Sequence, residues 1–82
     1  MIEFNKDLVE KYLPMIKKLA SMLGKTKDSF RIEELSAAGL EGLYKASKKF
    51  DESKKISFNT FAYIKIKGEI LDELRRTSWI MR

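Results

Sequence analysis

The chain has 82 residues, a formal net charge of +5, and neither cysteine nor histidine. This length allows a single domain, residues 1–82, near the lower limit for one hydrophobic core, and it leaves no room for a catalytic cleft between two lobes. The composition excludes disulfides, thiolate nucleophiles and sites for the softer metals, which need thiol or imidazole donors, so we expect no metal and no cofactor.

Apolar residues recur every three to four positions from about residue 5 to residue 23, a pattern typical of an amphipathic helix. Asn5 is suited to cap its start. Because Pro14 lacks the amide that would bond back one turn, we expect a kink there. Gly24 suits a helix C-terminus, and residues 24–29, which are all polar or glycine, indicate a mobile connection. The candidates for burial are Leu8, Tyr12, Ile16, Leu19 and Leu23.

A second helix is expected from about residue 32 to residue 50, with acidic residues in its first turn, where they favour the helix dipole. Gly39 and Gly42 lie inside it, although each glycine costs a helix interior about 1 kcal/mol relative to alanine. Beside two alanines, they predict that another helix backbone passes very close; a hinge is the alternative. A phosphate-binding loop is excluded, because no strand precedes these glycines and no Lys-Ser/Thr follows them. The candidates for burial are Ile32, Leu35, Leu43, Tyr44, Ala46 and Phe50.

A third helix is expected from a cap at Ser57 to about Thr77. Its apolar stripe, at steps of four, is Phe58, Ala62, Ile66, Ile70 and Leu74, flanked by Phe61 and Leu71. A polar stripe stays exposed: Lys65, Asp72, Arg75 and Arg76. Two pairs of opposite charge stand four residues apart, Lys65 with Glu69 and Asp72 with Arg76. Each pair can stabilise the helix by a few tenths of a kcal/mol, so these side chains need not serve a partner. With no alternating strand pattern, the predicted fold class is all-α, a compact bundle of three main helices.

Charge and hydropathy constrain the partners. Residues 1–41 hold seven basic and seven acidic side chains, whereas residues 42–82 hold ten and five. The excess of basic residues in the second half predicts that this half binds a polyanion. Charge alone is equally compatible with helix faces that are simply solvated. No apolar run approaches the ~18–20 residues needed to cross a bilayer, and the first residues lack a signal-peptide pattern. We therefore expect a soluble cytoplasmic protein without a membrane partner.

Four stretches carry a more specific pattern: E-L-S-A-A-G-L-E-G-L-Y-K-A at 34–46, K-F-D at 49–51, S-F-N-T-F-A at 57–62, and I-K-G-E-I-L-D-E-L-R-R at 66–76. Together with Trp79 and the L-P-M-I-K of residues 13–17, they resemble region 2 of bacterial sigma factors of the sigma-70 superfamily. The flagellar-type branch is the most similar, and residues 34–82 follow its pattern without a gap. Several dispersed motifs in the right order are a stronger signal than any one of them.

The resemblance implies that the second helix packs on the clamp coiled coil of the RNA polymerase beta-prime subunit. Here Ala37 stands where the family usually has glutamine, which removes one polar contact from that interface. The contact residues that the resemblance implies are Glu33, Glu34, Ala37, Ala38, Leu40 and Tyr44.

The resemblance also implies that the third helix and the turn before it engage promoter DNA, chiefly the single-stranded −10 region. Lys65 stands where arginine is common, and Met81 stands where flagellar-type members usually carry proline. We expect Trp79 to pack over the helix end, because Ile80 and Met81 beside it are also apolar. The DNA-binding residues that the resemblance implies are Lys54, Thr60, Phe61, Lys65, Lys67, Asp72, Arg75 and Arg82.

The residue types suit this role on chemical grounds. Phe61 beside basic residues offers a face for an unstacked base, a contact worth roughly 1–3 kcal/mol. Arg75 is suited to guanine or phosphate and Asp72 to a cytosine amino group, while Lys54 and Lys67 are suited to the DNA backbone. Two alternatives stay open: that Phe61 belongs only to the core, and that Asp72 only braces its helix.

The function expected is a non-enzymatic domain that recognises and melts the −10 element together with RNA polymerase. The alternative is a protein-interaction module that occupies the polymerase clamp or an anti-sigma factor without supporting transcription by itself. An enzyme is disfavoured, because no catalytic triad is present and the paired acids at 33–34 and 72–73 are adjacent on helices and point in different directions. An unrelated helix-turn-helix reader is disfavoured because the resemblance covers most of the chain. A flagellar-type sigma factor continues beyond region 2, so we expect an excised domain.

Overall fold

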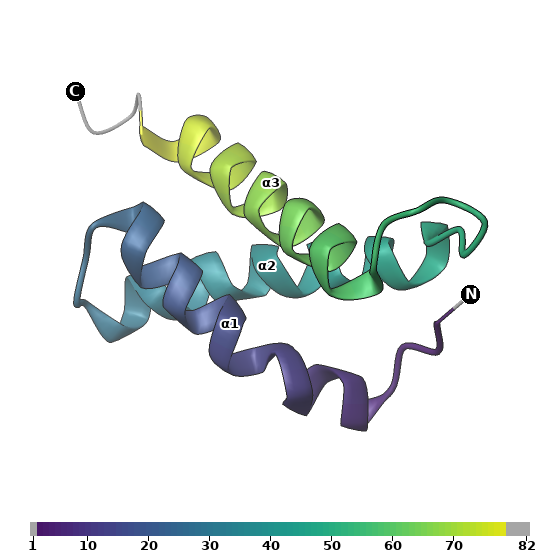
Figure 1. Ribbon diagram of the computed structural model, residues 1–82. Coiled ribbons are helices and arrows are strands. Elements are labelled where there is room, and N and C mark those ends of the chain that lie inside the picture. Colours follow the sequence, from purple (N-terminus) through teal and green to yellow (C-terminus); the bar gives the residue numbers. More distant parts are fainter. Residues whose placement is uncertain (1, 79–82) are drawn as a thin grey trace.

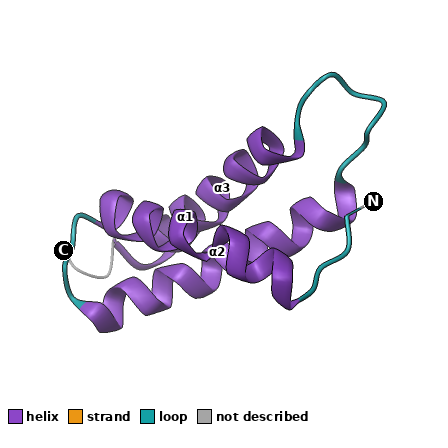
Figure 2. Ribbon diagram, turned by 60° about the horizontal axis from the view of Figure 1, so that its bottom comes forward, coloured by secondary structure: helices purple, strands orange, loops and turns teal. Residues whose placement is uncertain are grey.

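The computed structural model describes residues 2–78, which form three α-helices. These are α1 (Lys6–Gly24), α2 (Ser29–Lys49) and α3 (Phe58–Ser78), and α1 and α3 both pack on α2 (Figure 1). The loop between α2 and α3 lies at the end of the bundle where the N-terminal segment also lies (Figure 2). The described residues contain no strand, and the all-α prediction is confirmed. None of the three helices is long and apolar enough to cross a membrane.

Each helix begins after a residue whose side-chain oxygen accepts a hydrogen bond from a free backbone amide. The Asn5 Oδ1 atom accepts from the amide of Leu8 at 2.9 Å, and the Ser57 Oγ atom accepts from the amide of Thr60 at 3.1 Å, so both predicted caps are confirmed. α2 begins at Ser29 rather than near residue 32. Its cap is Asp28, whose carboxylate accepts from the amide of Phe30 at 3.3 Å.

The connection between α1 and α2 is short and hydrogen bonded. The left-handed residue at the end of α1 is Lys25, with φ of 51°, and not Gly24 as expected. The amides of Lys25 and Thr26 donate to the carbonyls of Met22 and Ser21, which closes the last turn. Gly24 serves packing instead, because a Cβ atom there would lie 2.6 Å from the Cδ1 atom of Leu35. These contacts define how the chain leaves α1, while the mobility of the connection stays a prediction.

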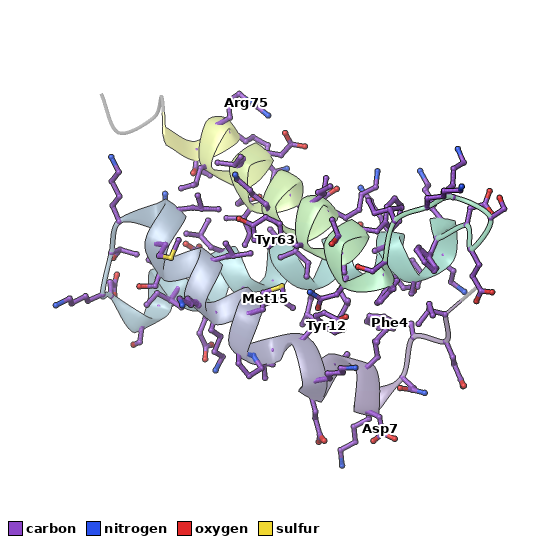
Figure 3. The ribbon with its side chains drawn as sticks, viewed as in Figure 1. Phe4, Asp7, Tyr12, Met15, Tyr63 and Arg75 are labelled. Carbon is purple, nitrogen blue, oxygen red and sulfur yellow. The ribbon has the colours of Figure 1, made fainter. Side chains whose placement is uncertain are left out.

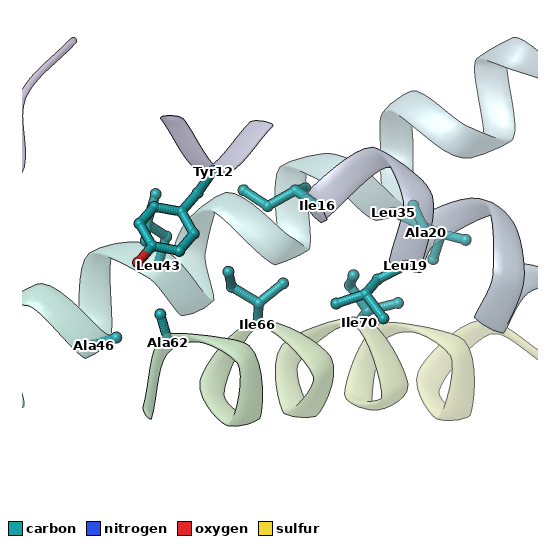
Figure 4. Close-up of a cluster of buried hydrophobic side chains, with 10 residues drawn as sticks. All are labelled: Tyr12, Ile16, Leu19, Ala20, Leu35, Leu43, Ala46, Ala62, Ile66 and Ile70. Carbon is teal, nitrogen blue, oxygen red and sulfur yellow. The ribbon is translucent and has the colours of Figure 1, made fainter. Parts of the chain in front are cut away.

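The core takes residues from all three helices (Figure 4). It comprises Tyr12, Ile16, Leu19, Ala20, Leu35, Leu43, Ala46, Ala62, Ile66 and Ile70. Other predicted core residues pack around it and are partly buried: Leu8, Leu23, Ile32, Phe58 and Leu74. Burial raises the pKa of the Tyr12 hydroxyl, because the charged form is poorly solvated there.

Two predicted positions of the core were wrong. Tyr44 is 45 % exposed, because its neighbour Leu43 occupies the side of α2 that faces the other helices. Leu71 is 37 % exposed and lies on the outer side of α3. At both positions an apolar residue directly follows a buried one, so the turn of the helix carries it to the surface.

The glycines inside α2 lie where the other helices approach closely. A Cβ atom on Gly42 would lie 2.5 Å from the carbonyl oxygen of Lys65 and 2.7 Å from the Cα atom of Ile66. A Cβ atom on Gly39 would lie 2.8 Å from the Cγ2 atom of Ile16 in α1. Close helix packing, which the sequence predicted, is confirmed.

α1 continues without interruption through Pro14, whose side chain is exposed. Proline removes one hydrogen bond from a helix interior but does not by itself end the helix when the turns on both sides pack against a core. On either side of it, Tyr12 and Ile16 are buried. A kink at Pro14 stays a prediction.

Candidate nucleic-acid interface

Four aromatic rings meet where α2 ends and α3 begins. The Phe58 ring lies edge-on to the rings of Phe50 and Tyr12, with centroids 5.3 Å and 5.8 Å away. The Phe50 ring lies 5.8 Å from the Phe61 ring. Such edge contacts are favourable because the ring edge is electropositive and the face electronegative. They hold the end of α2 against the first turn of α3 and so position Phe61.

Phe61 also borders an open pocket. The pocket has a volume of about 380 Å³ and is lined by Lys49, Phe50, Asp51, Lys54, Ile56 and Phe61. On another side of the ring, the ammonium group of Lys65 lies 5.4 Å from its centroid, a cation–π contact. Phe61 therefore takes part in packing and also lines a space with lysines around it.

The loop after α2 is held by Asp51. Its carboxylate accepts hydrogen bonds from the amide of Ser53 at 3.0 Å and from the Ser53 hydroxyl at 2.7 Å. These hydrogen bonds lower the pKa of Asp51 below its usual value, because they favour the charged carboxylate. The amide of Lys54 donates to the carbonyl of Asp51 at 3.1 Å, which closes the turn and leaves the Lys54 side chain exposed at the pocket.

Four of the predicted DNA-binding residues share one face of α3. Phe61, Lys65, Asp72 and Arg75 follow the spacing of a helical stripe, which we call the α3 ridge. Asp72 and Arg75 are exposed and Lys65 is half-buried. Figure 3 shows Arg75 projecting away from the bundle. The α3 ridge is thus open to a partner.

The ion pairs on α3 are not the two that the sequence spacing offered as an alternative to DNA contact. Asp72 pairs with Arg75 and Glu73 pairs with Arg76, each three residues apart, in place of an Asp72–Arg76 pair. Glu69 pairs with Lys45 of α2 in place of Lys65.

Glu69 joins α3 to α2. Its carboxylate accepts from the ammonium group of Lys45 at 2.7 Å. This hydrogen bond is the main cause that raises the pKa of Lys45, and the charge of Glu69 adds to it. The pair links α3 to α2, and Lys65, which does not pair with Glu69, lies over Phe61.

The remaining predicted DNA-binding residues do not all join the α3 ridge. Lys54 and Thr60 lie beside its beginning, and both are exposed. Lys67 lies on a different side of α3, because residues two apart point in different directions on a helix. Its ammonium group lies 5.9 Å from the ring centroid of Tyr63. Arg82 lies outside the described residues, as do Trp79, Ile80 and Met81.

The outer side of α3 carries a shallow pocket that the sequence did not predict. Its volume is about 360 Å³, and its lining residues are Ile64, Lys65, Gly68, Glu69, Leu71, Asp72 and Arg75. Three of them were predicted to bind DNA. The other four, Ile64, Gly68, Glu69 and Leu71, were missed. For Ile64, Gly68 and Leu71 the sequence did hold a signal, because the helical period places these two apolar residues and this glycine on the exposed side.

Gly68 has no packing role within the described residues, because a Cβ atom there would meet nothing within 4 Å. Gly68→Ala is therefore expected to stabilise the domain by about 1 kcal/mol, since alanine costs a helix less conformational entropy than glycine. Urea unfolding followed by circular dichroism measures the change. A loss of stability on this substitution would show that Gly68 has a structural role.

The residues predicted to contact the polymerase lie along α2. Glu33, Glu34, Ala37 and Tyr44 are exposed, whereas Ala38 and Leu40 are half-buried. Glu34 pairs with Arg31 at 3.7 Å. Phe30, which the sequence reasoning missed, is 70 % exposed and lies three residues before Glu33. The surface is therefore partly apolar and partly acidic.

The space between the two surfaces is acidic. A pocket of about 320 Å³ lies between α2 and α3 and is lined by Ala38, Glu41, Glu69, Asp72, Glu73 and Arg76. Carboxylates repel phosphate, so this pocket is unfavourable for a nucleic-acid backbone. Within residues 2–78, no group of acidic side chains is placed to hold a metal ion.

Comparison with known proteins agrees with this arrangement. The sequence matches the Sigma-70 region 2 family over residues 8–80. It is 41 % identical to RNA polymerase sigma factor FliA of Pseudomonas aeruginosa over 78 residues. The aligned region covers 94 % of this chain and 32 % of that protein. It is 36 % identical over 78 residues to RNA polymerase sigma-D factor of Bacillus subtilis, covering 93 % of this chain and 30 % of that protein.

FliA of Escherichia coli is 33 % identical over 76 residues, covering 92 % of this chain and 32 % of that protein. No solved structure gives a significant match. The chain spans about a third of the length of these relatives. The family match and the relatives together show that the chain belongs to the sigma-70 region 2 family, in the branch of the flagellar-type sigma factors.

Proposed function

We propose that this chain is the promoter-recognition domain of an RNA polymerase sigma factor, which acts in the cytoplasm by binding and without catalysis. In this proposal α2 docks on the clamp coiled coil of the polymerase, while the α3 ridge and the loop before it hold the −10 region of the promoter. The observation that carries the proposal is the α3 ridge, where an aromatic ring, a lysine, an aspartate and an arginine share one open face.

The first step is capture of a base. Extruding a base from a duplex costs a few kcal/mol, and stacking on an aromatic ring returns roughly 1–3 kcal/mol. Phe61 supplies this ring beside a pocket of about 380 Å³, and Lys49 and Lys54 line the same pocket. A base exposed by thermal opening of the duplex is trapped there, so melting of the −10 element needs no fuel.

The second step is selection of sequence. In the free domain Asp72 and Arg75 pair with each other, with their side chains 64 % and 74 % exposed. An exposed pair contributes about 0–1 kcal/mol, so separating it for DNA costs little. Arg75 can then donate to guanine or to a phosphate, and Asp72 can accept from the amino group of cytosine.

The polymerase is held on the other helix. Ala37 and Leu40, with the exposed ring of Tyr44, form an apolar stripe along α2, and Glu33 and Glu34 lie beside its beginning. A partner helix with apolar and basic residues fits this surface. Docking there leaves the α3 ridge free for DNA.

A second candidate function uses the same α2 surface. The domain would occupy the clamp or an anti-sigma factor without supporting transcription. The exposed ring of Phe30 favours this candidate, because Phe30 belongs neither to the α3 ridge nor to the predicted polymerase contacts.

The two candidates differ in what the clamp does to DNA affinity. The free domain is expected to bind a labelled single-stranded −10-like oligonucleotide with micromolar or weaker affinity, since few phosphate contacts release few counterions. Adding a beta-prime clamp fragment is expected to tighten this binding, and a fluorescence anisotropy titration measures the change. Clamp binding with no change in DNA affinity would support the second candidate instead.

A matched pair of variants assigns the effect to α2. Ala37→Arg adds bulk and charge in the middle of the exposed stripe and is expected to abolish the gain from the clamp. Met22→Arg adds the same side chain at another exposed position, on α1, and is expected to keep the gain.

A further inference from the structure

Gly68 differs from the other glycines of the described chain. A Cβ atom on Gly24, Gly39 or Gly42 would approach a neighbouring atom to less than 3 Å, whereas one on Gly68 would meet open space. Its φ is not positive, so the backbone conformation does not require glycine either. A glycine weakens a helix interior, and packing within residues 2–78 gives it no compensation. Because glycine has no side chain, a partner can approach the backbone of α3 closely at Gly68.

The surroundings of Gly68 form a notch with apolar walls. Ile64, one turn before it, is 53 % exposed, and Leu71, one turn after it, is also exposed. The same shallow pocket is lined by two cations, Lys65 and Arg75, and by two carboxylates, Glu69 and Asp72. The notch therefore carries no excess of positive charge, and what it offers a base is the pair of apolar walls.

The chemistry of the notch selects among the bases. Every base presents donors or acceptors along its edges, and these lose hydrogen bonds to water against Ile64 and Leu71. Thymine has the O4 acceptor but is alone in adding a C5 methyl group, which fits an apolar contact. We infer that the Gly68 notch receives the methyl edge of one thymine, and that Ile64 and Leu71 are specificity-determining residues. This inference rests on the proposed function.

The test removes one methyl group from the DNA. The domain with RNA polymerase core is titrated with a −10-like oligonucleotide in which each thymine is replaced in turn by deoxyuridine. One position is expected to bind about fourfold more weakly, the ratio that corresponds to burying one carbon group. Ile64→Ala and Leu71→Ala are expected to bring this ratio close to one. Tyr63→Ala removes a partly exposed ring outside the notch and is expected to keep it.

A second experiment fills the notch with a side chain. Gly68→Leu is expected to retain the fold, because its side chain points into open space. The preference for thymine over deoxyuridine is expected to disappear in this variant. Equal binding of every deoxyuridine oligonucleotide, or an unchanged preference in Gly68→Leu, would overturn the inference and leave the proposed function intact. Failure of the unsubstituted domain to bind any of the oligonucleotides with polymerase present would overturn both.

Discussion

Gly42→Ala is expected to destabilise the domain by about 3 kcal/mol, the upper part of the usual range for overpacking. The added Cβ atom would lie 2.5 Å from the carbonyl oxygen of Lys65 and 2.7 Å from the Cα atom of Ile66. Both are backbone atoms of α3, so the contact is relieved only if the two helices separate. Native proteins have a free energy of unfolding of about 5–15 kcal/mol, and small domains lie at the low end, so the loss is a large part of the total. Urea unfolding followed by circular dichroism measures it.

Gly39→Ala and Gly68→Ala are matched controls for this substitution. A Cβ atom on Gly39 meets side-chain methyl groups, of which the closest belongs to Ile16, and these can shift more easily than backbone. Gly68→Ala is therefore expected to be more stable than the unsubstituted domain. Gly39→Ala is expected to be less stable than the unsubstituted domain, and Gly42→Ala the least stable of the four. A Gly42→Ala domain as stable as the unsubstituted one would contradict the close contact of α2 and α3 on which the position of the α3 ridge depends.

Asp72→Ala and Arg75→Ala are expected to weaken the preference of the domain for particular bases. A good bidentate contact to a base discriminates by about 1–3 kcal/mol, which is roughly 5- to 150-fold in affinity. Because the two side chains pair with each other in the free domain, their effects are expected to be non-additive. A pair that only braced α3 would change helix stability by a few tenths of a kcal/mol and would leave base preference unchanged.

Local signals in the sequence predicted the helices and their closest contact. Asn5 and Ser57 cap helices as expected, because capping needs only residues within one turn. Gly39 and Gly42 predicted a close helix crossing, because their cost in a helix implies a compensating contact. The start of α2 was placed too late, because exposed Phe30 breaks the apolar pattern that the sequence reasoning followed.

Other features depend on contacts between helices, which periodicity does not contain. Leu43 and Tyr44 are adjacent and both apolar, and only the positions of α1 and α3 decide that Leu43 is buried. The partner of Glu69 is Lys45, which lies 24 positions earlier in the chain, so a search for partners one turn away could not find it. Lys67 was grouped with Lys65 by family resemblance, although the helix directs the two side chains apart.

The candidate site was predicted in part. Resemblance to the sigma factor pattern supplied Phe61, Lys65, Asp72 and Arg75, and the structure places these four on one face of α3. It also brings Lys54 and Phe61 to a common pocket. The notch at Gly68 could not be predicted, because its glycine has the same local sequence signal as a glycine that packs against another helix.

The most direct test of the proposed function is a titration of −10-like oligonucleotides against the domain with RNA polymerase core. The unsubstituted, Asp72→Ala and Arg75→Ala domains are each compared on the full set of single-base substitutions. The proposal predicts that both variants keep their helical circular dichroism and lose base preference at the positions that Asp72 and Arg75 contact. Unchanged base preference in both variants would contradict the assignment of the α3 ridge to promoter DNA.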